Sequence, residues 1–156
     1  MKPGSGLQRF AYRLKKLSSI ARSEVLDLIV AQAALLRAWW WVRTRPLGEL
    51  LRPAESVEEL VDSPDVHPRL QRLALATERA AEHGLFPATC LVRAVALEHL
   101  IRRSDTRGAV VRIGVLTSGG RLLAHAWIEY GGQVLADRPD RIRHFTVLQD
   151  FTALPR

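Results

Sequence analysis

The residues of this sequence best placed to carry out chemistry are Cys90, His125 and Asp137. Cys90 is the only cysteine, and it lies where the loop LFPAT turns into a helix. Whether Thr89 caps that helix or Pro87 takes its first position, Cys90 falls in the first turn. The unpaired N–H groups and positive dipole end there favour a thiolate, the nucleophilic form of cysteine. The alternative is a small buried apolar side chain, the common role of a free cysteine.

His125 is the histidine whose surroundings suit a general base. It lies in the middle of the apolar stretch RLLAHAWIEY, between two alanines that leave room for another element to approach the imidazole. A histidine packed in the core is the alternative. The other four lie at a helix end, in a proline-rich turn, on the far side of the helix from Cys90 and among arginines: His83, His67, His99 and His144.

Asp137 follows His125 by twelve residues and ends the next expected strand. A carboxylate there can hold the Nδ1–H of the imidazole, fix its tautomer and stabilise the imidazolium. Cys90, His125 and Asp137 would then supply a nucleophile, a base and a group that orients the base. Taken alone, Asp137 is equally well explained as a turn residue.

The turn between these two strands decides whether His125 and Asp137 can meet. A two-residue turn at residues 131–132 would set Asp137 opposite Ala126, on the face away from His125. A three-residue connection with a bulge, made with a glycine in the left-handed conformation, instead pairs His125 with Asp137. We predict this bulged register, with Cys90 within reach of the imidazole.

The elements that must position these residues give an α+β fold, with N-terminal helices followed by a catalytic helix packed on a small antiparallel sheet. Apolar periodicity, caps and Gly-Gly turns provide the assignments. We expect helices at 7–17, 23–43, 69–84 and 89–103, a connector of short turns at 47–68, and strands at 108–116, 121–130 and 133–137, with a further one at 143–148.

Composition and charge narrow the function. The 156 residues are enough for one globular domain, and no signal peptide is visible, so we expect a cytoplasmic protein with a reduced thiol. Residues 1–52 hold 10 Lys and Arg against 3 Asp and Glu, whereas residues 53–156 hold 13 of each. This basic, helical segment can meet an acidic partner or an anionic membrane surface, or be only a solvated face.

Trp39, Trp40 and Trp41 wrap around its second helix, so at least one should be exposed. Charged residues make that helix a poor membrane span.

The local sequences CLVRAVALEHLIRR, VRIGV and LLAHAWIEYGGQVLAD resemble the leader peptidase of lasso peptide biosynthesis, a transglutaminase-like cysteine protease. The AHAW stretch followed by Glu129 is the most distinctive part, and the Cys-Leu-x-Arg run at 90–93 is the second. The resemblance covers residues 67–150. It divides the chain into a basic helical lead-in and connector, 1–66, and a transglutaminase-like protease core, 67–156.

This resemblance implies that Cys90 is the nucleophile, His125 the general base and Asp137 the orienting residue, with no cofactor. The substrate would be the leader of a ribosomally made lasso precursor. Partners would be a separate precursor-recognition protein, because residues 1–66 do not resemble that module, and the ATP-dependent lasso cyclase. The Cys90 N–H is an expected oxyanion donor at the helix start, and the sequence offers no obvious second one.

Two other functions fit parts of the sequence. A thioester on the same scaffold can be taken by an amine as well as by water, which gives amidase or transamidase chemistry. A non-enzymatic adaptor would use the basic helices alone. Nucleic-acid binding rests only on charge, since no basic and aromatic pattern of an RNA-binding sheet accompanies it. No Cys/His pair has the spacing of metal ligands.

Overall fold

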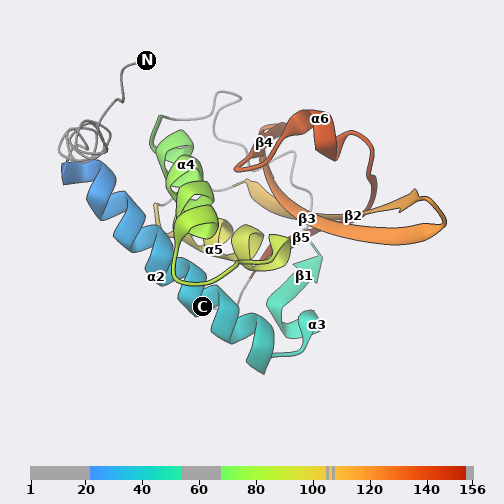
Figure 1. Ribbon diagram of the computed structural model, residues 1–156, viewed down its shortest axis with the longest axis horizontal. Helices are drawn as coiled ribbons and strands as arrows, with labels where there is room; N and C mark the ends of the chain where they lie inside the picture. The colour runs from blue at the N-terminus through green and yellow to red at the C-terminus, as the bar shows by residue number, and fades with distance from the viewer. Residues whose placement is uncertain (1–21, 54–67, 105, 107, 154–156) are drawn as a thin grey trace, which may run out of the picture.

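The computed structural model describes residues 22–53, 68–104, 106 and 108–153. The helix expected at 7–17 lies outside these residues. The elements of the described chain are α2 (Arg22–Thr44), α3 (Leu47–Leu50), β1 (Leu51–Pro53), α4 (Pro68–His83), α5 (Cys90–Arg103), β2 (Ala109–Ser118), β3 (Arg121–Tyr130), β4 (Gln133–Leu135), α6 (Pro139–Ile142) and β5 (Thr146–Ala153). Helices and a small antiparallel sheet form the fold, which confirms the α+β prediction (Figure 1).

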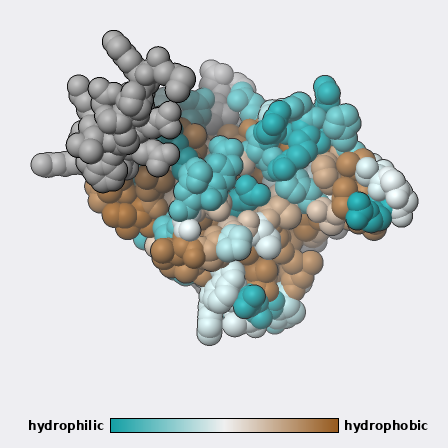
Figure 2. All heavy atoms as spheres, in the orientation of Figure 1, coloured by the Kyte–Doolittle hydropathy of each residue, from teal (hydrophilic) through white to brown (hydrophobic). Residues whose placement is uncertain are grey.

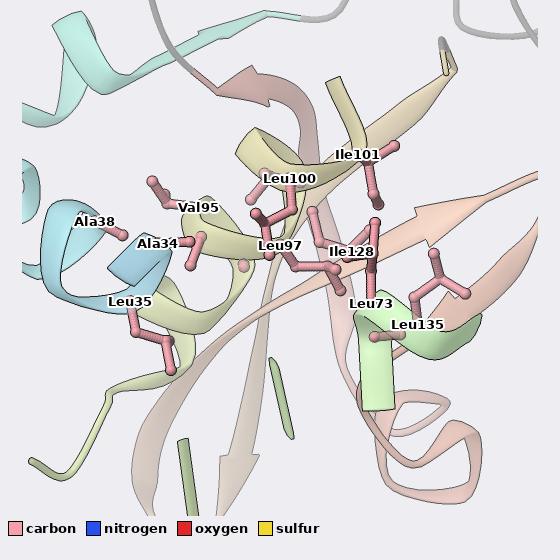
Figure 3. Close-up of a cluster of buried hydrophobic side chains, with 14 of the residues drawn as sticks. Ala34, Leu35, Ala38, Leu73, Val95, Leu97, Leu100, Ile101, Ile128 and Leu135 are labelled. Atoms are coloured by element: carbon pink, nitrogen blue, oxygen red, sulfur yellow. The ribbon is translucent and has the colours of Figure 1, made fainter. Parts of the chain in front are cut away.

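Three long helices, α2, α4 and α5, pack together and form the helical layer of the core. The apolar side of α4 is the predicted one, since Leu70, Leu73, Ala76 and Ala80 are all buried. The α2 helix contributes Ala34, Leu35 and Ala38 to this core, next to Val95, Leu97 and Leu100 of α5 (Figure 3). Part of the segment expected as a lead-in therefore belongs to the same core as α5.

The sheet has five strands in the order β1-β5-β2-β3-β4, and every neighbouring pair is antiparallel. The predicted meander runs from β2 through β3 to β4. The chain then passes through α6 and returns across the sheet, so that β5 lies between β2 and β1. The short edge strand β1 falls inside the stretch expected to be only turns. That expectation was wrong because three residues ending in a proline carry no strand signal of their own.

The α2 helix buries one side and exposes the other. By length and composition, Ser23–Thr44 meets the requirements of a membrane span, which are also met by core helices of soluble proteins. Ala31, Leu35 and Ala38 are fully buried. Trp40 is 61% exposed, as expected for at least one of the three tryptophans. The exposed apolar residues continue along the helix (brown in Figure 2): Val25, Leu26, Ile29, Val30 and Leu36.

Candidate active site

Cys90 is the first residue of α5, and the structure decides between the two possible helix starts. Thr89 is the cap: it has an extended backbone conformation, and its hydroxyl accepts a hydrogen bond from the Val92 N–H at 3.4 Å. Cys90 is a free thiol, partly buried at the margin of the core. The N–H groups of this first turn have no partner one turn earlier in the helix, so the helix end offers donors beside the sulfur.

His125 occupies the middle of β3, where aromatic rings fix its orientation. The imidazole stacks near the Trp127 indole, with ring centroids 6.2 Å apart, and lies 5.4 Å from the Phe145 ring. On the neighbouring strand β2 the residue opposite His125 is Gly114. A Cβ on Gly114 would come within 2.8 Å of the Trp127 ring, so the glycine leaves the space that this packing needs.

The imidazole and the Asp137 carboxylate are in direct contact. His125 Nε2 lies 2.6 Å from Asp137 Oδ2, and the two side chains are only 11% and 9% exposed. Because a carboxylate only accepts, the hydrogen of this bond belongs to Nε2, which leaves Nδ1 able to take a proton. The expectation that Asp137 would hold Nδ1 is therefore wrong: the carboxylate lies on the other nitrogen.

The predicted register of the β3–β4 hairpin is also wrong. Tyr130 pairs with Gln133, so the turn has two residues, with Gly131 and Gly132 at φ 55° and 75°. Positive φ at both positions is the pattern of a type I′ turn, whose twist matches that of the strands. This register would have carried Asp137 to the face away from His125 if the strand had continued.

The strand does not continue. β4 ends at Leu135, two residues before Asp137, and Ala136 has a φ of 54°. A single residue in the left-handed region reverses the alternation of side chains, as a bulge does. Asp137 can therefore contact His125 although the turn lacks the predicted bulge. The irregularity that was expected at the glycines lies at an alanine on the far end of β4.

The Asp137 carboxylate is saturated with donors. Its Oδ1 accepts from the Arg138 N–H at 2.7 Å and from the Arg141 guanidinium. Burial opposes ionisation, but the hydrogen bonds from His125 and the Arg138 N–H and the charge of Arg141 together hold the pKa of Asp137 below its ordinary value. Arg141 Nη2 also lies 3.1 Å from His125 Nε2. The carboxylate is therefore ionised at neutral pH, with Oδ2 directed to the imidazole.

A second set of polar contacts holds the Trp127 indole through its N–H group. Its indole N–H donates to Glu129 Oε1 at 2.7 Å, and Glu129 Oε2 lies 2.8 Å from Arg112 of β2. Arg112 also donates to Asp150 of β5 at 3.3 Å. Three strands are thus joined by charged hydrogen bonds on the face that carries His125, and the tryptophan beside the imidazole has both its ring and its N–H fixed.

A small cavity of about 10 Å³, the size of one water molecule, has both Cys90 and Asp137 in its lining, whereas His125 does not line it. Cys90, Arg93 and Leu97 line it from α5, and Ala126 and Asp137 line it from the sheet side. Within the described residues the structure gives no hydrogen bond between Cys90 Sγ and the imidazole. The approach of Cys90 to His125 stays a prediction, and catalytic contacts commonly tighten only when substrate binds.

Two features of this site escaped the sequence reasoning. Arg141 follows Asp137 by four residues, the spacing at which opposite charges pair on a helix, so a usable signal was present. The pairing of Glu129 with Arg112 had no such signal, because it depends on the register between two strands. Of the four discounted histidines, His67 lies outside the described residues, and His99 packs edge-on against Trp41.

Comparison with known proteins places this arrangement in a family. No curated protein and no solved structure matches the sequence. A family model described as the transglutaminase-like superfamily matches residues 29–150, which include most of α2, all of α4 and α5, and Cys90, His125 and Asp137. Such membership fits an enzyme of the cysteine protease or acyl-transfer class. Because the match spans most of the chain, this protein belongs to the transglutaminase-like superfamily.

Proposed function

We propose that this protein is a cysteine peptidase that removes the leader from a ribosomally made precursor of the lasso peptide type. The observation that carries the proposal is the His125–Asp137 hydrogen bond of 2.6 Å beside the cavity that Cys90 lines. Family membership supports the class of chemistry. The local likeness of the AHAW strand and the Cys90 helix to lasso leader peptidases supports the substrate.

The proposed reaction assigns each side chain one task. His125 Nδ1 takes the proton of the Cys90 thiol, the resulting thiolate attacks the carbonyl carbon of the last leader residue, and the Cys90 N–H donates to the developing oxyanion. The carbon–nitrogen bond then breaks as His125 gives its proton to the leaving amine, which leaves a thioester. Water attacks this thioester while His125 Nδ1 takes a water proton, and the leader acid leaves with the thiol restored. Asp137 holds Nε2–H throughout and stabilises the imidazolium.

The test is cleavage of a matched precursor in the presence of its recognition protein, followed by mass spectrometry. Cys90→Ala and His125→Ala should abolish cleavage without unfolding the chain. Asp137→Asn should leave a small residual activity, lower by about a thousandfold or more, because orientation is lost while the base remains. A Cys90→Ala variant that still cuts the precursor at the normal rate excludes the protease function.

The same experiment separates the alternatives. A leader product carrying an added amine in place of a free carboxylate would indicate transamidation, since the thioester then passes to an amine. A protein that neither cleaves the precursor nor reacts with thiol-trapping probes would be an adaptor. If replacement of His125 slows the alkylation of Cys90 by iodoacetamide, the pairing of Cys90 as nucleophile with His125 as base is supported.

We further propose that a separate recognition protein presents the leader, and that the ATP-dependent lasso cyclase consumes the product in the reducing cytoplasm. The exposed side of α2, with Trp40 and Leu26, is the surface we assign to the recognition protein. Arg37 and Arg43 lie over the Trp41 and Trp39 rings, close to Trp40 in sequence. Trp40→Ala should weaken partner-dependent cleavage, and an electrostatic contribution should fall with added salt. Loss of vesicle binding without loss of partner binding would point to a membrane surface instead.

A further inference from the structure

Arg141 contacts both members of the His125–Asp137 pair, and the proposed reaction leaves it without a task. Its guanidinium donates to Asp137 Oδ1, and its Nη2 lies 3.1 Å from His125 Nε2. The side chain is 48% exposed, so it covers the pair from the solvent side. An arginine that is always charged, placed on the outer edge of a nearly buried carboxylate, acts on both the geometry and the charge of that carboxylate.

The geometric consequence concerns which oxygen faces the imidazole. Oδ1 of Asp137 has two donors, Arg141 and the Arg138 N–H, whereas Oδ2 has His125. A carboxylate held on one oxygen by two donors loses the freedom to rotate its other oxygen away. Because the Asp137 backbone follows a left-handed residue at the end of a strand, side-chain contacts must supply the orientation that a continuing strand would otherwise give.

We propose that Arg141 is a positioning residue that holds Asp137 Oδ1 and so directs Oδ2 to the imidazole of His125. This inference rests on the proposed peptidase function. The neighbouring basic residues of the same segment are engaged elsewhere: the Arg138 side chain pairs with Asp140 at 2.9 Å, and Arg143 lies 3.3 Å from His144. The role is thus specific to one of three nearby arginines.

The decisive experiment compares Arg141→Met with Arg143→Met, which removes the same charge from the same segment. In the precursor cleavage assay, Arg141→Met should lower kcat about tenfold with KM unchanged, because Asp137 then holds the imidazole less well. Arg141→Lys should restore part of kcat, because its ammonium can still donate to Asp137 Oδ1. Arg143→Met should behave as the wild type.

Three outcomes overturn the proposal. A wild-type kcat in Arg141→Met would show that Arg141 does not position Asp137. A raised KM with unchanged kcat would mean that Arg141 binds substrate. An equal loss of kcat in Arg141→Met and Arg143→Met would reduce the effect to net charge. Thermal unfolding of each variant checks that it folds, and Arg141→Lys supplies the test if Arg141→Met does not.

A measurement on the free protein separates this inference from the proposed function. The Nε2–H signal of His125 can be followed by NMR with no substrate present. Arg141→Met should broaden this signal, because Asp137 Oδ2 is then held less firmly against Nε2, whereas Arg143→Met should not. A protein in which Cys90→Ala leaves cleavage intact, but in which Arg141→Met broadens the Nε2–H signal, would refute the peptidase function and retain the effect of Arg141 on the hydrogen bond between Asp137 and His125.

Discussion

The two faces of β3 are buried in different ways. One face carries Ala126, Ile128 and Tyr130, which pack into the apolar core with the helices. The other carries His125, Trp127 and Glu129, of which Trp127 is 2% and Glu129 8% exposed. The first face contacts its neighbours through apolar side chains. The second contacts its neighbours through directional hydrogen bonds, from the indole to Glu129 and from the imidazole to Asp137.

This difference shows how one strand can combine apolar packing on one face with oriented polar groups on the other. Apolar contact is nondirectional, so the core face stabilises the fold in proportion to the area it buries and tolerates small changes of shape. A buried polar group must instead meet each partner at the correct distance and angle, since an unpaired one is costly. We therefore expect changes on the core face to act mainly on stability, and changes on the His125 face to act mainly on orientation.

The strongest test of this comparison removes volume from the core face. Ile128 is 1% exposed, and Ile128→Ala should lower the free energy of unfolding by about 4 kcal/mol, from lost transfer energy and the remaining cavity. Leu122→Ala is the matched control, because Leu122 lies on the same strand and the same face but is 70% exposed. Urea unfolding measures both. Similar losses for the two variants would show that this face does not stabilise through burial.

The second test concerns a buried carboxyl of the helical layer. Both carboxylate oxygens of Glu129 have polar partners, whereas one oxygen of this carboxyl has none. Glu98 of α5 pairs with Arg102 through Oε1, but its buried Oε2 has no hydrogen bond. Burial outweighs the attraction of Arg102 and raises the pKa of Glu98 to about 7. Between pH 4.5 and 7 the folded state therefore holds a proton that the unfolded state has lost, and the free energy of unfolding falls as pH rises.

The expected size of this effect is about 3 kcal/mol between pH 4.5 and pH 8, since each pKa unit corresponds to about 1.4 kcal/mol. Glu98→Gln should remove it, because the amide does not ionise. Glu82→Gln serves as the control, since the Glu82 side chain is 55% exposed. Urea unfolding at the two pH values measures the difference. The explanation fails if wild type and Glu98→Gln lose the same stability over this range.

The sequence predicted those elements that depend on interactions between residues close together in the chain. The buried side of α4, the place of Cys90 in the first turn of α5 and the strands on either side of the two Gly-Gly turns follow from periodicity, capping and turn chemistry. The helical layer and the positions of Cys90 and His125 could therefore be placed before the structure was known.

The rest depends on contacts between distant segments. The insertion of β5 between β1 and β2 is a long-range pairing that no local pattern encodes. The left-handed conformation of Ala136 could not be predicted because alanine rarely adopts it, whereas the neighbouring glycines did signal their turn. The contact of Asp137 with His125 was predicted, but on the wrong imidazole nitrogen and through the wrong register.

A third test disturbs the His125 face without touching its polar groups. Gly114→Ala would place a Cβ 2.8 Å from the Trp127 ring and 3.0 Å from Phe145, so one of the two must move. We expect a loss of about 1–2 kcal/mol in the free energy of unfolding, and a larger relative loss of cleavage, because both rings fix the imidazole. Gly48→Ala, which meets nothing within 4 Å, is the control. Unchanged His125 NMR shifts in Gly114→Ala would contradict the role given to the rings.

The smallest expected effect comes from Ala136, the residue that brings Asp137 back to the His125 face. A left-handed alanine costs about 1 kcal/mol, and Ala136→Gly removes that cost while adding a similar amount of freedom to the unfolded chain. The free energy of unfolding should therefore change by less than about 0.5 kcal/mol, with cleavage retained. Ala136→Val, whose branched side chain resists positive φ, should instead destabilise the protein by about 1–2 kcal/mol and separate Asp137 from His125. Thermal unfolding and the NMR signals of the His125 ring are measured for both variants. If Ala136→Val keeps the stability and the ring signals of the wild type, the left-handed residue is not what brings Asp137 to the imidazole.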